Sequence, residues 1–148
     1  MRSENIHILL ADDDKDDCDF FSEALKEIPL SITLTTVHDG AGLIELLTKA
    51  TGQLPHVLFL DLNLPLKNGF DCLSEIKRHN KLMSLPVIIF STSFTQEIAD
   101  HLYKNGAQHY IRKPPQFSQL KKIIHQALTI IGKNNLGEAT HEKFVLSV

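Results

Sequence analysis

The sequence of 148 residues contains no tryptophan, only two cysteines, and few glycines and prolines. Two cysteines are too few for the disulfide framework of a small secreted domain, and the low Gly and Pro content excludes a fibrous chain. Cys18 and Cys72 both fall at apolar positions of helical patterns, so we expect reduced core residues. What remains is a chain long enough to bury the core of one globular domain.

Long hydrophobic runs and an excess of positive charge are also missing. The longest apolar runs have the length of a strand, so we expect no membrane span, and residues 1–4 lead into a strand without a signal-peptide core. The formal net charge of -3 gives no electrostatic reason to bind a nucleic-acid backbone. We therefore expect a cytoplasmic protein that acts without direct contact to nucleic acid or membrane.

Short apolar segments alternate with helical patterns along most of the chain. We predict strands at residues 6–11, 32–37, 56–60, 87–90 and 108–112. Apolar residues at three- and four-residue spacing predict helices over residues 18–28, 43–47, 70–76, 98–102 and 117–131. Strict alternation predicts an α/β fold with a doubly wound five-stranded parallel sheet. The fifth strand is more polar than the others, so we place it at a sheet edge.

Polar side chains follow four of these strands. Asp12 and Asp13 follow the first, Asp61 the third, Ser91 the fourth and Lys113 the fifth. Because parallel strands end at the same edge of a sheet, these groups are expected to share one crevice. They supply a nucleophile, oxygen ligands for a hard cation and donors for phosphoryl oxygens. Three neighbouring carboxylates repel one another unless a cation joins them, and Mg²⁺ suits oxygen ligands.

Each residue alone has a simpler interpretation. Asp61 can be a turn or capping residue, and the acidic run at residues 12–14 a solvated helix start. Ser91 can be a satisfied hydroxyl, Lys113 a surface charge, and Tyr110 a half-buried aromatic of an edge strand. The shared sheet edge is what favours a joint site.

The ordered motifs are those of a known family. Asp12-Asp13, the segment Asp61-Leu-Asn-Leu-Pro, Ser91-Thr, and Tyr110-Ile-Arg-Lys113-Pro resemble the receiver domains of two-component response regulators. The resemblance covers residues 5–132 and implies the flavodoxin-like (βα)5 receiver fold. Residues 133–148 are left as a C-terminal tail without an output domain, in which residues 144–146 form either a frayed end or a short strand.

The resemblance also implies a role for each residue. Asp61 would be the phosphoacceptor. Asp13, Asp61 and the carbonyl of Asn63 would bind Mg²⁺ directly, and Asp12 would hold it chiefly through a bound water. Lys113 and Ser91 would contact phosphoryl oxygens, and Ser91 and Tyr110 would form a conformational switch, in which Tyr110 turns inward. The peptide bond between Lys113 and Pro114 is expected to be cis.

These roles imply a stand-alone response regulator and not an enzyme. A sensor histidine kinase or a histidine phosphotransfer protein would supply the phosphoryl group, and an effector protein would read the switched face; a homodimer through that face stays open. One alternative is an Mg²⁺-dependent phosphatase with an Asp nucleophile, but that class places a second Asp at the position of Asn63. A nucleotide-binding domain would need a glycine-rich first turn. A receiver-like scaffold that is never phosphorylated is the last alternative.

Overall fold

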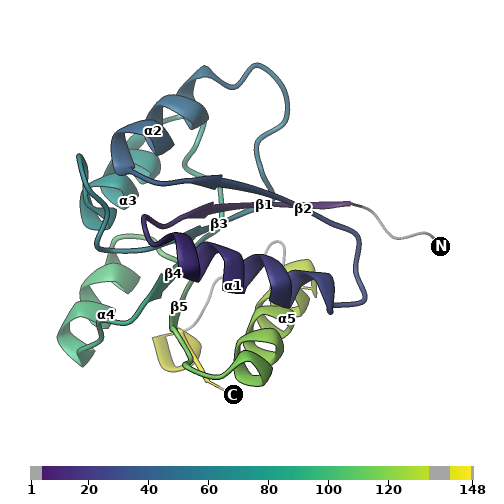
Figure 1. The fold of residues 1–148 in the computed structure, drawn as a ribbon. Coiled ribbons are helices and arrows are strands. Elements are labelled where there is room, and N and C mark those ends of the chain that lie inside the picture. Colours follow the sequence, from purple (N-terminus) through teal and green to yellow (C-terminus); the bar gives the residue numbers. More distant parts are fainter. Residues whose placement is uncertain (1–4, 134–140, 148) are drawn as a thin grey trace.

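The computed structural model describes residues 5–133 and 141–147 (Figure 1). Strands and helices alternate along the chain. The strands are β1 (Ile6–Ala11), β2 (Ile32–Val37), β3 (Val57–Leu60), β4 (Val87–Ser91), β5 (His109–Arg112) and β6 (Val145–Leu146). The helices are α1 (Lys15–Lys26), α2 (Gly40–Lys49), α3 (Gly69–Arg78), α4 (Gln96–Lys104) and α5 (Phe117–Lys133). The predicted α/β fold is confirmed.

All strand pairs are parallel, and the sheet order is β2-β1-β3-β4-β5-β6. Helices α1 and α5 cover one face of this sheet, and α2, α3 and α4 cover the other (Figure 1). β3 and β4 lie in the middle and are buried throughout, as strands covered on both faces must be. The arrangement brings the carboxyl ends of β1, β3, β4 and β5 to one edge.

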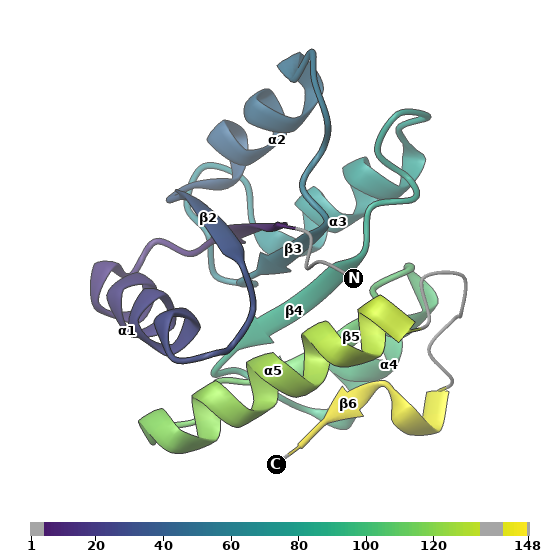
Figure 2. The same cartoon turned by 90° about the vertical axis from the view of Figure 1, so that its right-hand side faces the viewer.

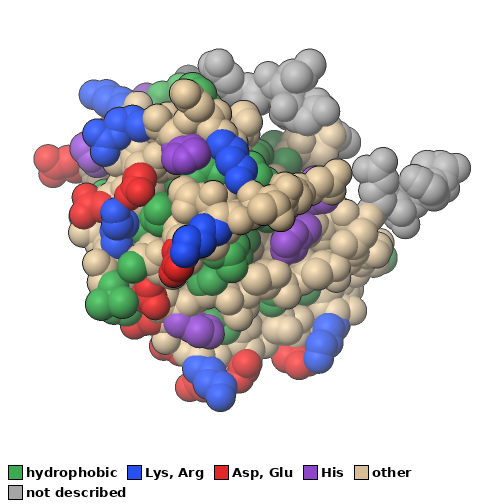
Figure 3. Space-filling model, turned by 90° about the horizontal axis from the view of Figure 1, so that it is seen from above, with side chains coloured by type: hydrophobic (Ala, Val, Ile, Leu, Met, Phe, Trp, Pro, Cys, Tyr) green, Lys and Arg blue, Asp and Glu red, His purple; other side chains and the backbone are tan. Residues whose placement is uncertain are grey.

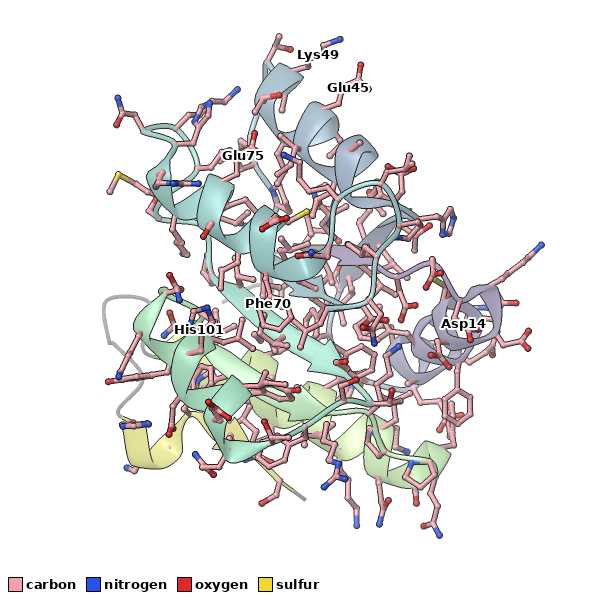
Figure 4. All side chains as sticks on the ribbon, turned by 90° about the vertical axis from the view of Figure 1, so that its left-hand side faces the viewer. Asp14, Glu45, Lys49, Phe70, Glu75 and His101 are labelled. Carbon is pink, nitrogen blue, oxygen red and sulfur yellow. The ribbon has the colours of Figure 1, made fainter. Side chains whose placement is uncertain are left out.

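Side-chain caps define where four helices begin. Asp14, Asp39, Asn68 and Thr95 each accept a hydrogen bond from the backbone N–H three residues later. Each cap satisfies an amide that has no partner inside its helix. Figure 4 labels Asp14, the residue that caps the start of α1.

The prediction that β5 lies at the sheet edge is wrong, because β6 pairs with its outer side. The polar character of β5 that suggested an edge comes partly from His109, which is buried. Its Nδ1 lies 3.2 Å from the carbonyl oxygen of Phe144, to which it donates a hydrogen bond. Of the two alternatives for residues 144–146, the short strand is the one observed, and the sheet has six strands where five were predicted.

Both cysteines lie in the core as free thiols, as predicted. Burial raises the pKa of the Cys18 thiol to about 11 and that of Cys72 to about 11. At neutral pH both are therefore protonated and unreactive.

The surface has no dominant charge sign in the view from above, where acidic and basic side chains are interspersed (Figure 3). Within the described residues, none of the helices has both the length and the apolar character needed to cross a membrane.

Candidate functional site

Three carboxylates converge where β1 and β3 end. One oxygen from each of Asp12, Asp13 and Asp61 lies within 4.8 Å of the other two. Asp12 and Asp61 are buried, whereas Asp13 is exposed. The backbone brings them together directly, because the Asp61 N–H donates to the carbonyl oxygen of Ala11, 3.0 Å away. The predicted acidic cluster is therefore confirmed as a geometric fact.

Lys113 reaches this cluster from the end of β5. Its Nζ lies 2.8 Å from Asp12 Oδ2 and 3.0 Å from Asp61 Oδ2, and it also lies 2.8 Å from Asp17 Oδ2. The Lys113 N–H donates to the carbonyl oxygen of Ser91, 2.9 Å away, which directs the side chain over the carboxyl ends of the strands. Only 9% of the lysine side chain is exposed, so it is not a surface charge.

The trans geometry of the peptide bond after Lys113 corrects a prediction, since the described residues contain no cis bond and a cis bond to Pro114 was expected. The hydrogen bond from the Lys113 N–H to Ser91 orients the side chain without it.

Burial and charge oppose each other at Asp12 and Lys113. Desolvation raises the pKa of Asp12, although the Lys113 ammonium and the Asp14 N–H both lower it. Burial alone would lower the pKa of Lys113, but its contacts with Asp12, Asp17 and Asp61 outweigh burial and raise that pKa. The lysine is therefore firmly charged at neutral pH. Asp12 Oδ2 is buried, and the Lys113 ammonium, 2.8 Å away, is its charged partner.

Ser91 and Tyr110 lie one step further from the acids. Ser91 ends β4, is fully buried, and its Oγ accepts a hydrogen bond from the Ser93 N–H, 3.2 Å away. Tyr110 is also fully buried, which excludes a half-buried edge aromatic. Its ring packs edge-on against Phe94, with ring centroids 5.3 Å apart, and its hydroxyl donates to the Ser93 carbonyl oxygen. The ring points into the protein.

The comparison with known families identifies this arrangement. Residues 8–125 match the response regulator receiver domain family. The chain belongs to this family. As a receiver domain it is a protein of two-component signalling, a family in which histidine kinases phosphorylate the receiver and effectors take up the signal.

Similar proteins come from archaea and cyanobacteria. The receiver domain is 29% identical to the probable methanogenesis regulatory protein FilR2 of Methanothrix harundinacea, over 80% of this chain and 79% of FilR2. It is 30% identical to the response regulator Rcp1 of Synechocystis, over 79% of this chain and 82% of Rcp1. Among solved structures, the phosphorylated cyanobacterial phytochrome response regulator RcpA is 30% identical, with a TM-score of 0.79 over 93% of this chain and 100% of the other.

The acidic cluster fits a divalent cation. Carboxylate oxygens are the ligands that Mg²⁺ and similar hard cations prefer, and the carboxylates here outnumber the one ammonium group. Asp12 Oδ2 is buried and shares the Lys113 ammonium with Asp61, so a divalent cation would supply positive charge that this group of carboxylates lacks. A structure of Rcp1 in its Mn²⁺-bound form, 27% identical with a TM-score of 0.76 over 91% of this chain and 99% of that one, belongs to the same fold.

The backbone N–H of Asn63 donates to Asp61 Oδ1, 3.2 Å away. Its side-chain amide donates to Ser93 Oγ at 3.4 Å, a contact that links the Asp61 loop to the loop after β4. Gly69 makes this turn tight, because a Cβ there would lie 2.4 Å from the Asp61 carbonyl oxygen. Whether the Asn63 carbonyl faces a cation stays a prediction.

Asp17 is the residue that sequence reasoning missed. It lies in the first turn of α1 and pairs with Lys113. The available signal was the acidic run continuing past residue 14 into the helix, but helical periodicity alone does not say which acid of a first turn faces a lysine 96 residues away.

Proposed function

We propose that this protein is a phosphorylation-dependent switch in which Asp61 accepts a phosphoryl group from a phosphohistidine. The donor would be a sensor histidine kinase or a histidine phosphotransfer protein, and the output would be contact with an effector protein. The observation that carries this proposal is the position of the Asp61 carboxylate, 3.0 Å from the Lys113 ammonium and beside the carboxylates of Asp12 and Asp13. Membership of the receiver family supports it.

The proposed chemistry is an in-line displacement at phosphorus. A carboxylate oxygen of Asp61 forms the new O–P bond while the P–N bond to the donor imidazole breaks, and the imidazole nitrogen leaves with the electron pair. Asp12, Asp13, Asp61 and the Asn63 carbonyl would hold Mg²⁺. When bound, the cation neutralises charge on the transferring group.

Lys113 and Ser91 would receive the remaining phosphoryl oxygens. The Lys113 ammonium already lies against Asp61 and stays protonated because its pKa is raised, so it can pair with one oxygen. The Ser91 hydroxyl can donate to another, since its present contact with the Ser93 N–H uses it as an acceptor. Both residues lie at the ends of neighbouring strands, which fixes them without a large rearrangement.

Phosphorylation adds about one further negative charge and three acceptor oxygens. Moving a two-state element from 1:99 to 99:1 takes roughly 5.5 kcal/mol, and charge-assisted hydrogen bonds supply about 1.5–3 kcal/mol each. Two or three such bonds at Ser91 and Lys113 are therefore enough to drive a switch. Tyr110 would respond to this switch, because its hydroxyl donates to the carbonyl oxygen of Ser93, in the loop that follows Ser91.

The proposal includes the domain organisation and the setting. Residues 5–132 would form the receiver domain and residues 133–148 a C-terminal tail, in a protein of the cytoplasm that does not act on nucleic acid directly.

Phosphorylation with acetyl phosphate and Mg²⁺ tests the proposal. Intact-mass spectrometry should show one added phosphoryl group that hydroxylamine removes, and Asp61→Asn should abolish it. Asp71→Asn, which changes an acid in the first turn of α3, is the matched control and should be phosphorylated normally.

Other results would favour other functions. Sustained release of phosphate from a phosphomonoester would support a phosphatase with an Asp nucleophile. A wild-type protein that takes up no phosphoryl group would support an unphosphorylated scaffold and contradict the proposal.

A further inference from the structure

Residues 141–147, called here the C-terminal segment, dock on α4 and β5. Figure 2 shows β6 of this segment beside α5 near the C-terminus. The Tyr110 N–H donates to the Phe144 carbonyl oxygen at 3.0 Å, so the pairing begins at the proposed switch residue itself. His141 stacks on Tyr103 of α4 with ring centroids 4.6 Å apart and planes at 6°, and its Nε2 lies 2.7 Å from Asp100 Oδ1.

Phe144 anchors the segment. Its side chain is 1% exposed and packs edge-on against Tyr103 and Tyr110, with ring centroids 5.4 Å and 6.4 Å apart. The Tyr110 ring therefore packs between two aromatic rings, that of Phe94 from the loop after β4 and that of Phe144 from the C-terminal segment. Removing the Phe144 side chain would leave the buried Tyr110 ring without one of these two aromatic contacts.

Continuous contacts join this tyrosine to the phosphorylation site. Asp61 Oδ1 accepts from the Asn63 N–H, and the Asn63 side chain donates to Ser93 Oγ at 3.4 Å. The Ser93 carbonyl oxygen accepts the hydrogen bond from the Tyr110 hydroxyl. Ser93 is thus held from one side by the Asp61 loop and from the other by Tyr110.

We propose that docking of the C-terminal segment and phosphorylation of Asp61 are coupled through Tyr110 and Ser93, each favouring the other. This inference rests on the proposed function. The docked segment holds Tyr110 inward, and Tyr110 holds the loop at Ser93, two residues after the hydroxyl that would bind the phosphoryl group. A loop already held in one arrangement binds that group at a lower ordering cost.

Beryllofluoride with Mg²⁺, a mimic of the phosphoryl group, tests the coupling in the full-length protein. Its binding is measured by fluorine NMR of the bound complex. Phe144→Ala should weaken binding by a factor in the range typical of coupled sites, roughly 5- to 150-fold. Phe144→Leu should recover part of the loss, because it restores apolar volume.

Two further variants separate coupling from lost stability. Leu47→Ala creates a cavity at a fully buried position of α2, which is not part of the C-terminal segment or of the elements on which it docks. This variant should lose stability but keep the beryllofluoride affinity of the wild type. His141→Ala removes an exposed ring from Tyr103 without opening a core cavity, and should weaken binding by a smaller factor than Phe144→Ala.

Thermodynamic linkage requires that bound beryllofluoride favour docking of the C-terminal segment by the same factor by which docking favours beryllofluoride binding. Hydrogen exchange at the Tyr110 N–H, which is protected by Phe144 when the segment is docked, should slow on adding beryllofluoride by the factor lost in Phe144→Ala. Equal affinities of wild type and Phe144→Ala, with an unchanged exchange rate, overturn this inference alone. A wild-type protein that binds no beryllofluoride overturns the proposed function and this inference with it.

Discussion

Replacing Lys113 by methionine would remove the only ammonium group that the described structure places among the site carboxylates. Methionine keeps most of the apolar length and loses the charge. Two of the three partners, Asp12 and Asp61, have side chains 0% and 8% exposed, so water cannot take over the role of the lysine. The third partner, Asp17, is 39% exposed and can be hydrated.

The expected loss follows from these exposures. Leaving a buried charge without its partner costs about 3–5 kcal/mol, whereas an exposed pair such as that with Asp17 contributes about 1 kcal/mol or less. We therefore expect Lys113→Met to lower the free energy of unfolding by about 3–5 kcal/mol without Mg²⁺. That is a large share of the roughly 5–15 kcal/mol typical of a domain.

Urea denaturation followed by circular dichroism measures this loss, since the chain has no tryptophan to report unfolding by fluorescence. Lys121→Met is the matched control, because Lys121 forms an exposed ion pair with Glu27 and the net charge changes equally. It should cost less than about 1 kcal/mol. At 100 times its dissociation constant Mg²⁺ should stabilise Lys113→Met by about 2.7 kcal/mol, and at the same Mg²⁺ concentration it should stabilise the wild type by less.

The pH dependence of the free energy of unfolding is a second, independent test of the same variant. Burial already raises the pKa of Asp12, and removing Lys113 takes away the main group that lowers it. Between the ordinary aspartate pKa and the raised folded one, the folded state binds more protons, so the variant should recover stability as pH falls through that window. A loss below about 1 kcal/mol, or a loss that grows in acid, would refute the account of Lys113 as a buried counter-ion.

Three smaller predictions concern the backbone conformation and the buried histidine of β5. Gly69→Ala should lower the free energy of unfolding in urea by about 2 kcal/mol or more, because its Cβ would meet backbone atoms at 2.4 Å and 2.7 Å. Gly132→Ala in α5 is the control: its Cβ meets nothing within 4 Å, so the change should be neutral or stabilising by up to about 1 kcal/mol. Leu66→Asn should stabilise by up to about 1 kcal/mol, since Leu66 has φ 68° with its side chain 81% exposed, and a loss of stability would contradict this. Burial lowers the pKa of His109, so its contribution to the free energy of unfolding should be complete above the ordinary histidine pKa and should fall as pH drops toward the lower pKa of the folded state. His109→Gln should therefore show a flatter pH profile in urea denaturation. Identical profiles for the variant and the wild type would contradict a lowered His109 pKa.

Much of the architecture could be predicted because local patterns and parallel-sheet topology agree. The uniformly apolar segment before Asp61 predicts a strand covered on both faces, and the right-handed crossover rule places such strands in one parallel sheet. Once the strands are parallel, the positions of Asp12, Asp61 and Lys113 at one edge follow from their places in the chain. That is why the acidic cluster and its lysine were found from sequence.

The contacts that were missed depend on side-chain orientation and on distant pairing. Asp17 faces Lys113 because of the exact rotation of α1, which spacing of apolar residues fixes only roughly. The edge position of β5 was wrong because only two residues, Val145 and Leu146, form the strand beside it, and so short a pattern cannot be separated from a loop. The burial of Tyr110 was not predicted for the same reason, because Phe144, which packs against its ring, directly precedes this short strand.

The two-residue length of β6 has a consequence for how the protein behaves in concentrated solution. Without it, the outer side of β5 would present a row of unpaired backbone groups beside the buried side chains of Tyr110 and Ile111, a template on which another chain could add a strand. β6 closes that template while offering very little edge of its own. We expect this small strand to protect the protein from forming aggregates by strand addition.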